Sequence, residues 1–346
     1  MMTKIYFNRW FSTVYHYMNA IRENEDGAVF EIHASHPDPG HMSLQGADKA
    51  VTEPVLEGQA YAEYCAEYCR KHAIDVFIPR LHMLDIVQHA GLFDQIGTKI
   101  LACRDADLLE DMLRKDKFYE NAMAKGVVDI PDYRVVNTVE QFEQAYSELT
   151  GKGHRVCIKP AESEGGLGFR IVGEPADPLA DLYGYVTPLL PFEDIRRRLS
   201  RAERFPDLMV MELLEGREYS IDCLADASGE LRAAVPRRKI GGRVRMLENN
   251  ARLLEIAGKV AVAYRIPYNF NIQVKYSGET PKLLEINPRM SGGLHLSCLS
   301  GVNFPYLAVK SALGGEIGPL QPQYGVLASH IEQPVVLRTA EPVPER

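Results

Sequence analysis

Residues 269–293 read NFNIQVKYSGETPKLLEINPRMSGG, with a run of alternating apolar residues on each side of the turn-rich pentapeptide Ser277–Pro281. This pattern predicts a β-hairpin. If Tyr276 pairs with Lys282, Gln273 lies opposite Glu285. Because strand side chains alternate between two faces, the polar residues share one face and the apolar residues share the other. The expected polar set is Asn271, Gln273, Glu285 and Asn287, and the expected apolar set is Phe270, Ile272, Val274, Leu284 and Ile286.

Oxygen-bearing side chains dominate the polar face of this hairpin. Carboxylate and amide oxygens on a rigid sheet are the ligands that a small hard cation such as Mg²⁺ prefers. Pro288 ends the pairing, and Arg289 follows it. A metal ion beside an arginine is suited to phosphate chemistry. The competing interpretation is an ordinary half-polar hairpin at the edge of a sheet.

The segment LLEINPRMSGG, residues 283–293, resembles the metal-binding strand and catalytic arginine of the ATP-grasp superfamily. The resemblance is to the branch that includes carbamoyl phosphate synthetase large subunits and other carboxylate–amine ligases. It implies that Gln273, Glu285 and Asn287 hold Mg²⁺, with Mn²⁺ as an alternative. It also implies that Arg289 contacts the transferred phosphate. At the position of Gln273, members of this branch carry either Gln or Asp. Because this chain has Gln, fewer negative charges are available to hold the metal.

The bulk composition fits a globular protein. The 346 residues are enough for two or three domains. The net charge of −8 argues against a general nucleic-acid-binding surface. The sequence has no run of about 18 apolar residues and no apolar leader segment. We therefore expect a cytoplasmic protein that binds neither membranes nor nucleic acid.

Two groups of potential metal ligands lie outside the hairpin. Cys65 and Cys69 are one helical turn apart, but a metal site there would need two further ligands. His33, His36 and His41 surround a Pro-Asp-Pro-Gly segment that does not fix their geometry. We therefore interpret the cysteines as buried hydrophobic residues and the three histidines as parts of a solvated loop.

Candidate strands alternate with candidate helices through residues 1–105, which predicts a small parallel α/β domain. One helix shows the expected apolar spacing at Val14, Tyr17, Met18 and Ile21. No G-x-G-x-x-G motif follows the first strand, so a dinucleotide site is not expected. The region resembles the pre-ATP-grasp domain that precedes the ligase core in this superfamily.

A glycine-rich loop, residues 162–168, follows the strand Arg155–Lys159 and leads into another strand, Phe169–Val172. Such glycines let backbone amides approach an anion closely. The strand on each side excludes a P-loop and a dinucleotide-binding loop, because both of those open a helix. The loop resembles the flap that covers ATP in ATP-grasp enzymes, within a subdomain over residues 106–205. The resemblance implies ATP contacts from Lys117, Lys159, Ser163, Gly165, Gly166 and Gly168.

The apolar run Leu208–Leu214 predicts a buried strand. The residues after it, Glu215–Ser220, resemble the nucleotide hinge of the superfamily, within a second subdomain over residues 206–346. The resemblance implies adenine contacts from Glu212 and Leu214 and a ribose contact from Glu218.

Five basic residues occur between Arg237 and Arg245 in an otherwise acidic chain. The segment is short and has no interleaved aromatic residues, which disfavours nucleic acid. It resembles the large loop of the superfamily, where basic residues meet a substrate or the triphosphate. The sequence leaves both ligands open, and we favour Arg237 and Arg238 as the contacts.

Together these features imply a mixed α/β and α+β fold, in which a small parallel α/β domain precedes a two-subdomain ATP-grasp fold. The implied activity is ATP-dependent ligation of a small-molecule carboxylate to an amine or thiol. The carboxylate would attack the γ-phosphate to give an acyl phosphate and ADP, and the second nucleophile would then displace phosphate. Two alternatives are a small-molecule kinase and a catalytically silent nucleotide-binding regulatory module. A homodimer is an expectation from the superfamily alone.

Overall fold

A computed structural model describes residues 2–162, 166–175, 177, 179, 183, 186–332 and 334–336 of the chain. Its contacts divide the chain into two compact units. The first unit contains residues up to Leu109, residues Tyr219–Gln273 and residues from Ile286 onward. The second unit contains Glu110–Glu218 and Val274–Glu285. The expected division into domains at residues 105 and 205 stays a prediction.

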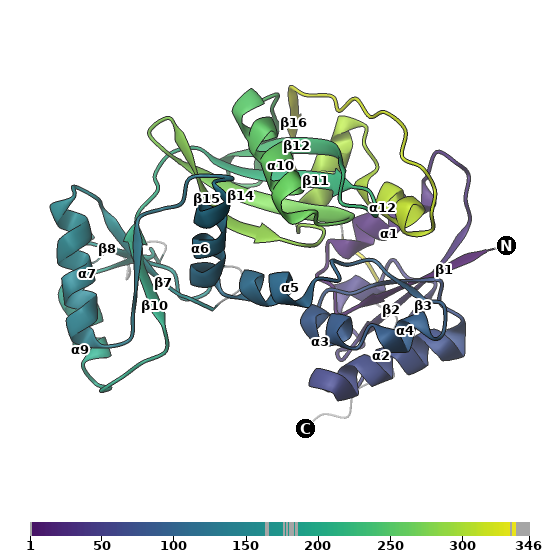
Figure 1. Cartoon of the computed structure of the whole chain (residues 1–346), viewed down its shortest axis with the longest axis horizontal. Coiled ribbons are helices and arrows are strands. Elements are labelled where there is room, and N and C mark those ends of the chain that lie inside the picture. Colours follow the sequence, from purple (N-terminus) through teal and green to yellow (C-terminus); the bar gives the residue numbers. More distant parts are fainter. Residues whose placement is uncertain are drawn as a thin grey trace. The chain divides into compact units, whose positions relative to one another are not determined.

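The first unit begins with a five-stranded parallel sheet in the order β3-β2-β1-β4-β5. Helix α1 carries Val14, Tyr17, Met18 and Ile21 on its buried side, so the predicted apolar spacing is confirmed. The strands are β1 (Thr3–Asn8), β2 (Phe30–His36), β3 (Lys49–Thr52), β4 (Val76–Ile78) and β5 (Lys99–Ile100). The helices are α1 (Val14–Arg22), η1 (Met42–Leu44), α2 (Gly58–His72), α3 (Met83–Gln88) and α4 (Gly91–Asp94) (Figure 1).

One expectation for this region is wrong. His33 does not lie in a solvated loop, because β2 extends to His36 and buries the His33 side chain completely. Its ring nitrogens contact the Tyr68 hydroxyl at 2.9 Å and the Glu31 carboxylate at 2.7 Å. The interpretation of the cysteines holds for five of the six, which are buried, while Cys298 is half-buried.

The second unit contains a five-stranded sheet in the order β6-β10-β7-β8-β9. Strand β10 pairs antiparallel with β6 and with β7, and Phe142 and Leu149 of α7 pack against this sheet. The strands are β6 (Tyr133–Val136), β7 (Val156–Pro160), β8 (Arg170–Val172), β9 (Leu189–Leu190) and β10 (Leu208–Glu212). The helices are α6 (Lys115–Lys125), α7 (Val139–Gly151) and α9 (Phe192–Leu199), and α5 (Ala106–Leu113) runs across the boundary of the two units.

A six-stranded sheet has the order β15-β14-β11-β12-β13-β16. Its core in the first unit joins Leu224 and Val235 of the sheet with Phe304 of α12. The strands are β11 (Glu218–Ala225), β12 (Leu231–Gly241), β13 (Val244–Leu247), β14 (Asn269–Ser277), β15 (Thr280–Asn287) and β16 (Val326–Ala328). The helices are α10 (Ala251–Tyr264), α11 (Leu294–Ser297), η2 (Cys298–Ser300) and α12 (Phe304–Ala312).

The predicted hairpin is present as β14 and β15, with differences in detail. Only Gly278 and Glu279 form the turn, so the expected inclusion of Thr280 and Pro281 is wrong. In the apolar set, Leu283 is fully buried while Leu284 is half-buried, so the expected place of Leu284 is also wrong. The buried positions of β15 are Pro281, Leu283 and Ile286, so the alternation of buried residues changes between Leu283 and Ile286. The Leu283 amide also donates to the Asp129 carbonyl at 2.8 Å, which pairs this part of β15 with the chain near Asp129.

The basic segment is also not a loop. Residues up to Gly241 continue β12, and β13 begins at Val244, with Arg237 opposite Leu247 and Arg238 opposite Met246. The antiparallel pairing shifts register between Lys239 and Gly241, and before that shift it places the successive side chains of Arg237 and Arg238 on opposite faces of the sheet.

Candidate nucleotide and metal site

Lys159 lies near the end of β7 in the second unit, beside Tyr119 of α6. Its ammonium group is 3.3 Å from the Tyr119 hydroxyl and 5.3 Å from the centre of that ring. The pKa of Lys159 is lowered to about 8, chiefly by burial and next by the Lys115 cation, while Glu285 acts in the opposite direction. Lys159 therefore keeps most of its charge at neutral pH.

This lowered pKa predicts a pH dependence of nucleotide use. As pH rises through about 8, Lys159 loses the charge that would attract the phosphates, so kcat/KM for ATP should fall. Lys159→Arg keeps its charge throughout this range and should abolish the decline. The measurement is kcat/KM for ATP between about pH 7 and pH 9.5. Identical profiles for the two proteins would contradict the assignment.

Glu285 of β15 belongs to the same group of residues in the second unit. The Tyr119 hydroxyl donates to the Leu284 carbonyl at 2.9 Å, which ties α6 to this strand. Burial raises the pKa of Tyr119 well above its ordinary value, and the Glu285 charge raises it further. Lys159, Tyr119 and Glu285 are therefore in mutual reach within one unit.

Two lysines of α6, Lys115 and Lys117, have different surroundings. Lys117 is exposed on α6, whereas Lys115 at the start of this helix is half-buried and near enough to lower the pKa of Lys159. The Lys115 amide also donates to the Ala161 carbonyl, just beyond β7. The role of Lys117 stays a prediction, and Lys115 is a residue that the sequence reasoning missed. The signal that could have found Lys115 is its position two residues before Lys117, on the same turn of α6.

The glycine-rich loop is described only in part. Ser163 and Gly165 lie outside the described residues. Gly166 and Gly168 have φ angles of +77° and +76°, which glycine adopts without strain. A Cβ atom on Gly168 would lie 2.8 Å from the Pro160 ring, so this position requires glycine for space as well.

The predicted hinge follows β10 and is anchored by its backbone to β14. The Gly216 amide donates to the Tyr276 carbonyl at 3.0 Å, and the Tyr276 amide donates to the Arg217 carbonyl at 2.9 Å. A Cβ atom on Gly216 would lie 2.6 Å from the Tyr276 oxygen. Leu214 is buried within this segment and Glu218 is half-buried. These backbone hydrogen bonds hold Gly216 and Arg217 of the hinge against Tyr276 of β14.

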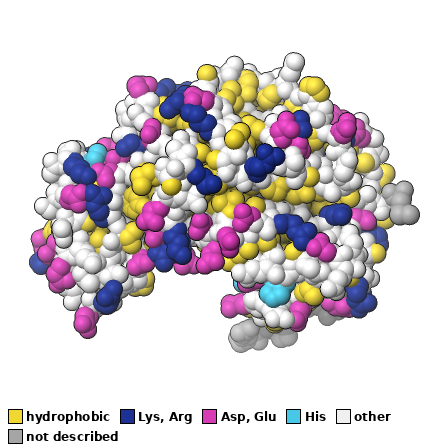
Figure 2. Space-filling view, in the orientation of Figure 1, with side chains coloured by type: hydrophobic (Ala, Val, Ile, Leu, Met, Phe, Trp, Pro, Cys, Tyr) yellow, Lys and Arg dark blue, Asp and Glu magenta, His cyan; other side chains and the backbone are white. Residues whose placement is uncertain are grey.

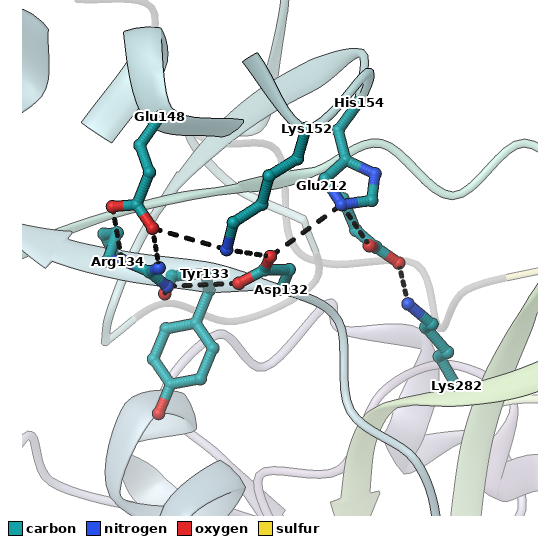
Figure 3. A network of polar contacts seen from close by, with 8 residues as sticks. All are labelled: Asp132, Tyr133, Arg134, Glu148, Lys152, His154, Glu212 and Lys282. Atoms are coloured by element: carbon teal, nitrogen blue, oxygen red, sulfur yellow. Dashed lines mark hydrogen bonds and ion pairs between the residues drawn. The ribbon is translucent and has the colours of Figure 1, made fainter. Parts of the chain in front are cut away.

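The side chain of Glu212 joins a polar network around the hinge (Figure 3). Its buried carboxylate pairs with Lys282 of β15 at 2.5 Å and lies 3.5 Å from the His154 ring. His154 leads on to Asp132 at 3.8 Å. No local pattern in the sequence indicates Lys282 or His154, because their contacts with Glu212 join residues far apart in the chain.

In the first unit, Gln273, Asn287 and Arg289 lie at the inner ends of the hairpin, and all three are half-buried. The Arg289 guanidinium donates to the Asn287 side-chain carbonyl at 3.3 Å and to the Met290 backbone carbonyl at 3.1 Å. It also lies 5.7 Å from the centre of the Phe11 ring. The roles of these three residues stay predictions.

Arg237 and Arg238 have different surroundings. Arg237 is buried and pairs at 3.2 Å with Asp222, which is fully buried and also accepts from Asn271, Ser291 and Ser297. Arg238 pairs with Glu248 at 2.6 Å, and its side chain is 30% exposed. The geometry gives Arg237 a structural partner and leaves Arg238 the more accessible cation.

This difference predicts losses of stability of different size. Arg237→Met would leave the Asp222 charge buried without its cation and should lower the free energy of unfolding by about 3 kcal/mol. Arg238→Met should cost less than about 1 kcal/mol, because its pair is partly exposed. Urea unfolding of both variants tests this. Equal stabilities would contradict the burial argument.

The described part of the chain contains no group of three His, Cys, Asp or Glu side chains that could hold a metal ion by themselves. The predicted set of one carboxylate, Glu285, and two amides, Gln273 and Asn287, fits Mg²⁺ that is shared with substrate phosphates.

On the face in Figure 2, basic and acidic side chains are interspersed. Among the described residues, no helix has the length and apolar character needed to cross a membrane.

Solved structures share this architecture. PurK, an N5-carboxyaminoimidazole ribonucleotide synthetase in an ADP complex, matches with a TM-score of 0.67 at 14% identity, over 93% of this chain and 79% of that chain. The biotin carboxylase domain of 2-oxoglutarate carboxylase from Hydrogenobacter thermophilus, with MgADP and bicarbonate, matches with a TM-score of 0.63 at 15% identity, over 94% and 73%. The chain therefore has the ATP-grasp fold, and the predicted fold class is confirmed.

Sequence comparison agrees. The family model "ATP-grasp in the biosynthetic pathway with Ter operon" matches residues 204–334. The carbamoyl phosphate synthase large chain of Methanobrevibacter smithii is 23% identical over 311 residues, which is 84% of this chain and 27% of that protein. The chain spans only 19–27% of the length of the carbamoyl phosphate synthase chains that it matches. The resemblance to the ATP-grasp superfamily is thus confirmed.

Proposed function

We propose that the chain is an ATP-dependent ligase that joins a small-molecule carboxylate to an amine or thiol through an acyl phosphate, with release of ADP and phosphate. The observation that carries this proposal is the grouping of Lys159, Tyr119 and Glu285 in the second unit. A lysine for phosphates and a carboxylate for metal are thereby held within reach of each other by a buried tyrosine.

In this proposal, Lys159 with Lys115 or Lys117 neutralises the phosphates of ATP. A charge pair at about 4 Å contributes about 4 kcal/mol at an effective dielectric constant near 20. The hinge around Leu214 receives adenine, and Glu218 binds ribose hydroxyls. Gln273, Glu285 and Asn287 would hold Mg²⁺ or Mn²⁺, which supplies charge neutralisation at the transferred phosphate when bound.

The proposed chemistry requires no protein nucleophile. A carboxylate oxygen of the substrate attacks the γ-phosphorus as the bond to ADP breaks. The amine then attacks the acyl carbon, phosphate leaves, and the amine proton passes to solvent. The chain contributes orientation and charge, with Arg289 directed to the transferred phosphate. Burial raises the pKa of the Cys157 thiol to about 12, so this cysteine is protonated at neutral pH.

The test is an ADP-release screen over amino acids and small carboxylates, with mass spectrometry of the products. We expect ADP release that depends on both a carboxylate and an amine or thiol. AMP as the product would indicate adenylate chemistry and contradict the proposal. A phosphorylated product that survives without a second nucleophile would favour the kinase alternative. A homodimer and a cytoplasmic location stay predictions.

A further inference from the structure

A buried ion pair in the second unit joins the strand that precedes the hinge to the strand that carries Glu285. The ammonium group of Lys282 on β15 is 2.5 Å from the carboxylate of Glu212, the last residue of β10 (Figure 3). Only 2% of the Glu212 side chain and 19% of the Lys282 side chain are exposed. Glu285 follows three residues after Lys282 on the same strand. The pair therefore connects the end of β10 to the strand of the predicted metal carboxylate.

The backbone at the end of β10 is held by the neighbouring chain of its own sheet. The Glu212 amide donates to the Asp132 carbonyl at 2.9 Å, and the next amide, that of Leu213, donates to the Arg155 carbonyl at 2.7 Å. The Glu212 side chain instead reaches the hairpin through Lys282. The start of the hinge is thus fixed to one sheet by its backbone and to β15 by a side chain.

Strand β15 also contacts the group that is proposed to bind the phosphates. The Leu284 carbonyl accepts from the Tyr119 hydroxyl at 2.9 Å, and that hydroxyl is 3.3 Å from the Lys159 ammonium group. Lys282 and Leu284 are two positions apart, which is about 7 Å along a strand. A short piece of one strand therefore sets the spacing between the hinge and the phosphate-binding lysine.

The Glu212 carboxylate depends on Lys282 for its place. Its Oε2 atom has no hydrogen-bond partner among the described residues and lies 3.5 Å from the His154 ring. The same ring is 3.8 Å from Asp132, and its side chain is 31% exposed, so it is held less firmly than Lys282. Because a buried carboxylate is strongly destabilised without its cation, loss of Lys282 would draw Glu212 away from its present position.

We propose that Lys282 is a positioning residue for the nucleotide: through Glu212 it fixes the hinge at the distance from Lys159 that ADP and ATP require. In this assignment Lys282 touches neither the nucleotide nor the metal. Loss of the pair weakens ligands that span the hinge and the phosphate-binding lysine, and it spares ligands that occupy the phosphate end alone. The assignment rests on the proposed function for the identity of the nucleotide site.

The test compares ADP, which spans both parts of the site, with inorganic tripolyphosphate, which lacks the base and the ribose. Binding of each probe to the full chain is measured by isothermal titration calorimetry in the presence of Mg²⁺. Lys282→Met should weaken ADP binding about tenfold and leave tripolyphosphate binding within about twofold, because coupling through one contact network changes affinity by about this amount. Unchanged ADP binding, or equal losses for the two probes, would overturn the proposal.

A second variant separates positioning from stability. Lys282→Met leaves a buried charge without its cation and should also lower the melting temperature. Combining Lys282→Met with Glu212→Gln removes that charge, so the double variant should regain most of the melting temperature while still binding ADP about tenfold more weakly than the original protein. ADP binding that recovers together with the melting temperature would show that the pair serves stability alone.

Lys152→Met is the matched control from the same polar network (Figure 3). Lys152 is 44% exposed and pairs with Asp132 at 2.8 Å, so its loss should change the binding of neither probe. A tenfold loss of ADP binding in this control would contradict a specific role of Lys282.

The outcome is distinguishable from that of the ADP-release screen. If ADP binding changes as expected but no acid and amine cause ADP release, Lys282 keeps its role and the ligase proposal fails. If the screen detects ADP release while Lys282→Met binds ADP normally, only the assignment of Lys282 fails. A chain that binds neither probe would overturn both.

Discussion

Replacing Lys159 with methionine should lower kcat/KM for ATP by about 10³-fold. The loss corresponds to about 4 kcal/mol, the value of one charge pair at about 4 Å in a partly buried site. Methionine retains the length of the side chain and its contact with the Tyr119 ring, so the effect of charge is isolated. Steady-state kinetics at pH 7 measures it, because Lys159 is then mainly charged.

Two controls accompany this variant. Lys159→Arg keeps the positive charge and should retain activity within about tenfold of the original. Lys152→Met removes a lysine of the same unit that is 44% exposed and pairs with Asp132. It should leave kcat/KM for ATP unchanged, since exposed pairs contribute little. If Lys159→Met were as active as Lys152→Met, Lys159 would have no role in nucleotide binding.

The hairpin shows what local sequence patterns can predict. Alternation of apolar and polar residues found both strands and the buried positions of Phe270, Ile272 and Val274. The same rule misplaced Leu284, because the buried positions of β15 are Pro281, Leu283 and Ile286 and thus do not keep one period of two along the strand. A pattern of period two assumes one regular strand and cannot report a change of face within it.

Side-chain roles depended even more on distant contacts. Lys115 and Lys117 are two residues apart on one helix, and only the folded chain shows which is nearer to Lys159. Similarly, nothing next to Arg237 in the sequence indicated that it would be buried and paired with Asp222. The order of motifs along the chain predicted the fold. The ion pairs and burial of each charged side chain depend on residues that are distant in the sequence.

Glu285→Gln should cause the second large loss, about 10³-fold in kcat at a fixed magnesium concentration. Glu285 is the one carboxylate in the predicted metal set, and the change to an amide preserves its shape while removing its charge. Loss of a metal-directed charge contributes several kcal/mol to the barrier of phosphoryl transfer. The concentration of Mg²⁺ needed for half-maximal activity should rise, and excess Mg²⁺ or Mn²⁺ should restore part of the rate.

The matched control lies on the same hairpin. Glu279→Gln changes a turn carboxylate that is 91% exposed and pairs with Arg217, so activity and metal requirement should stay unchanged. Equal losses in both variants, or an unaltered Mg²⁺ requirement in Glu285→Gln, would remove Glu285 from the metal set.

The Glu285→Gln protein should show one more difference that a purely structural role would not produce. Glu285 raises the pKa of Lys159, so removing its charge lowers that pKa below its present value of about 8. A lower pKa means that Lys159 loses its proton at a lower pH. The decline of kcat/KM for ATP should therefore begin at a more acidic pH in Glu285→Gln than in the original protein. The Glu279→Gln profile should not move, because its carboxylate is exposed and paired with Arg217.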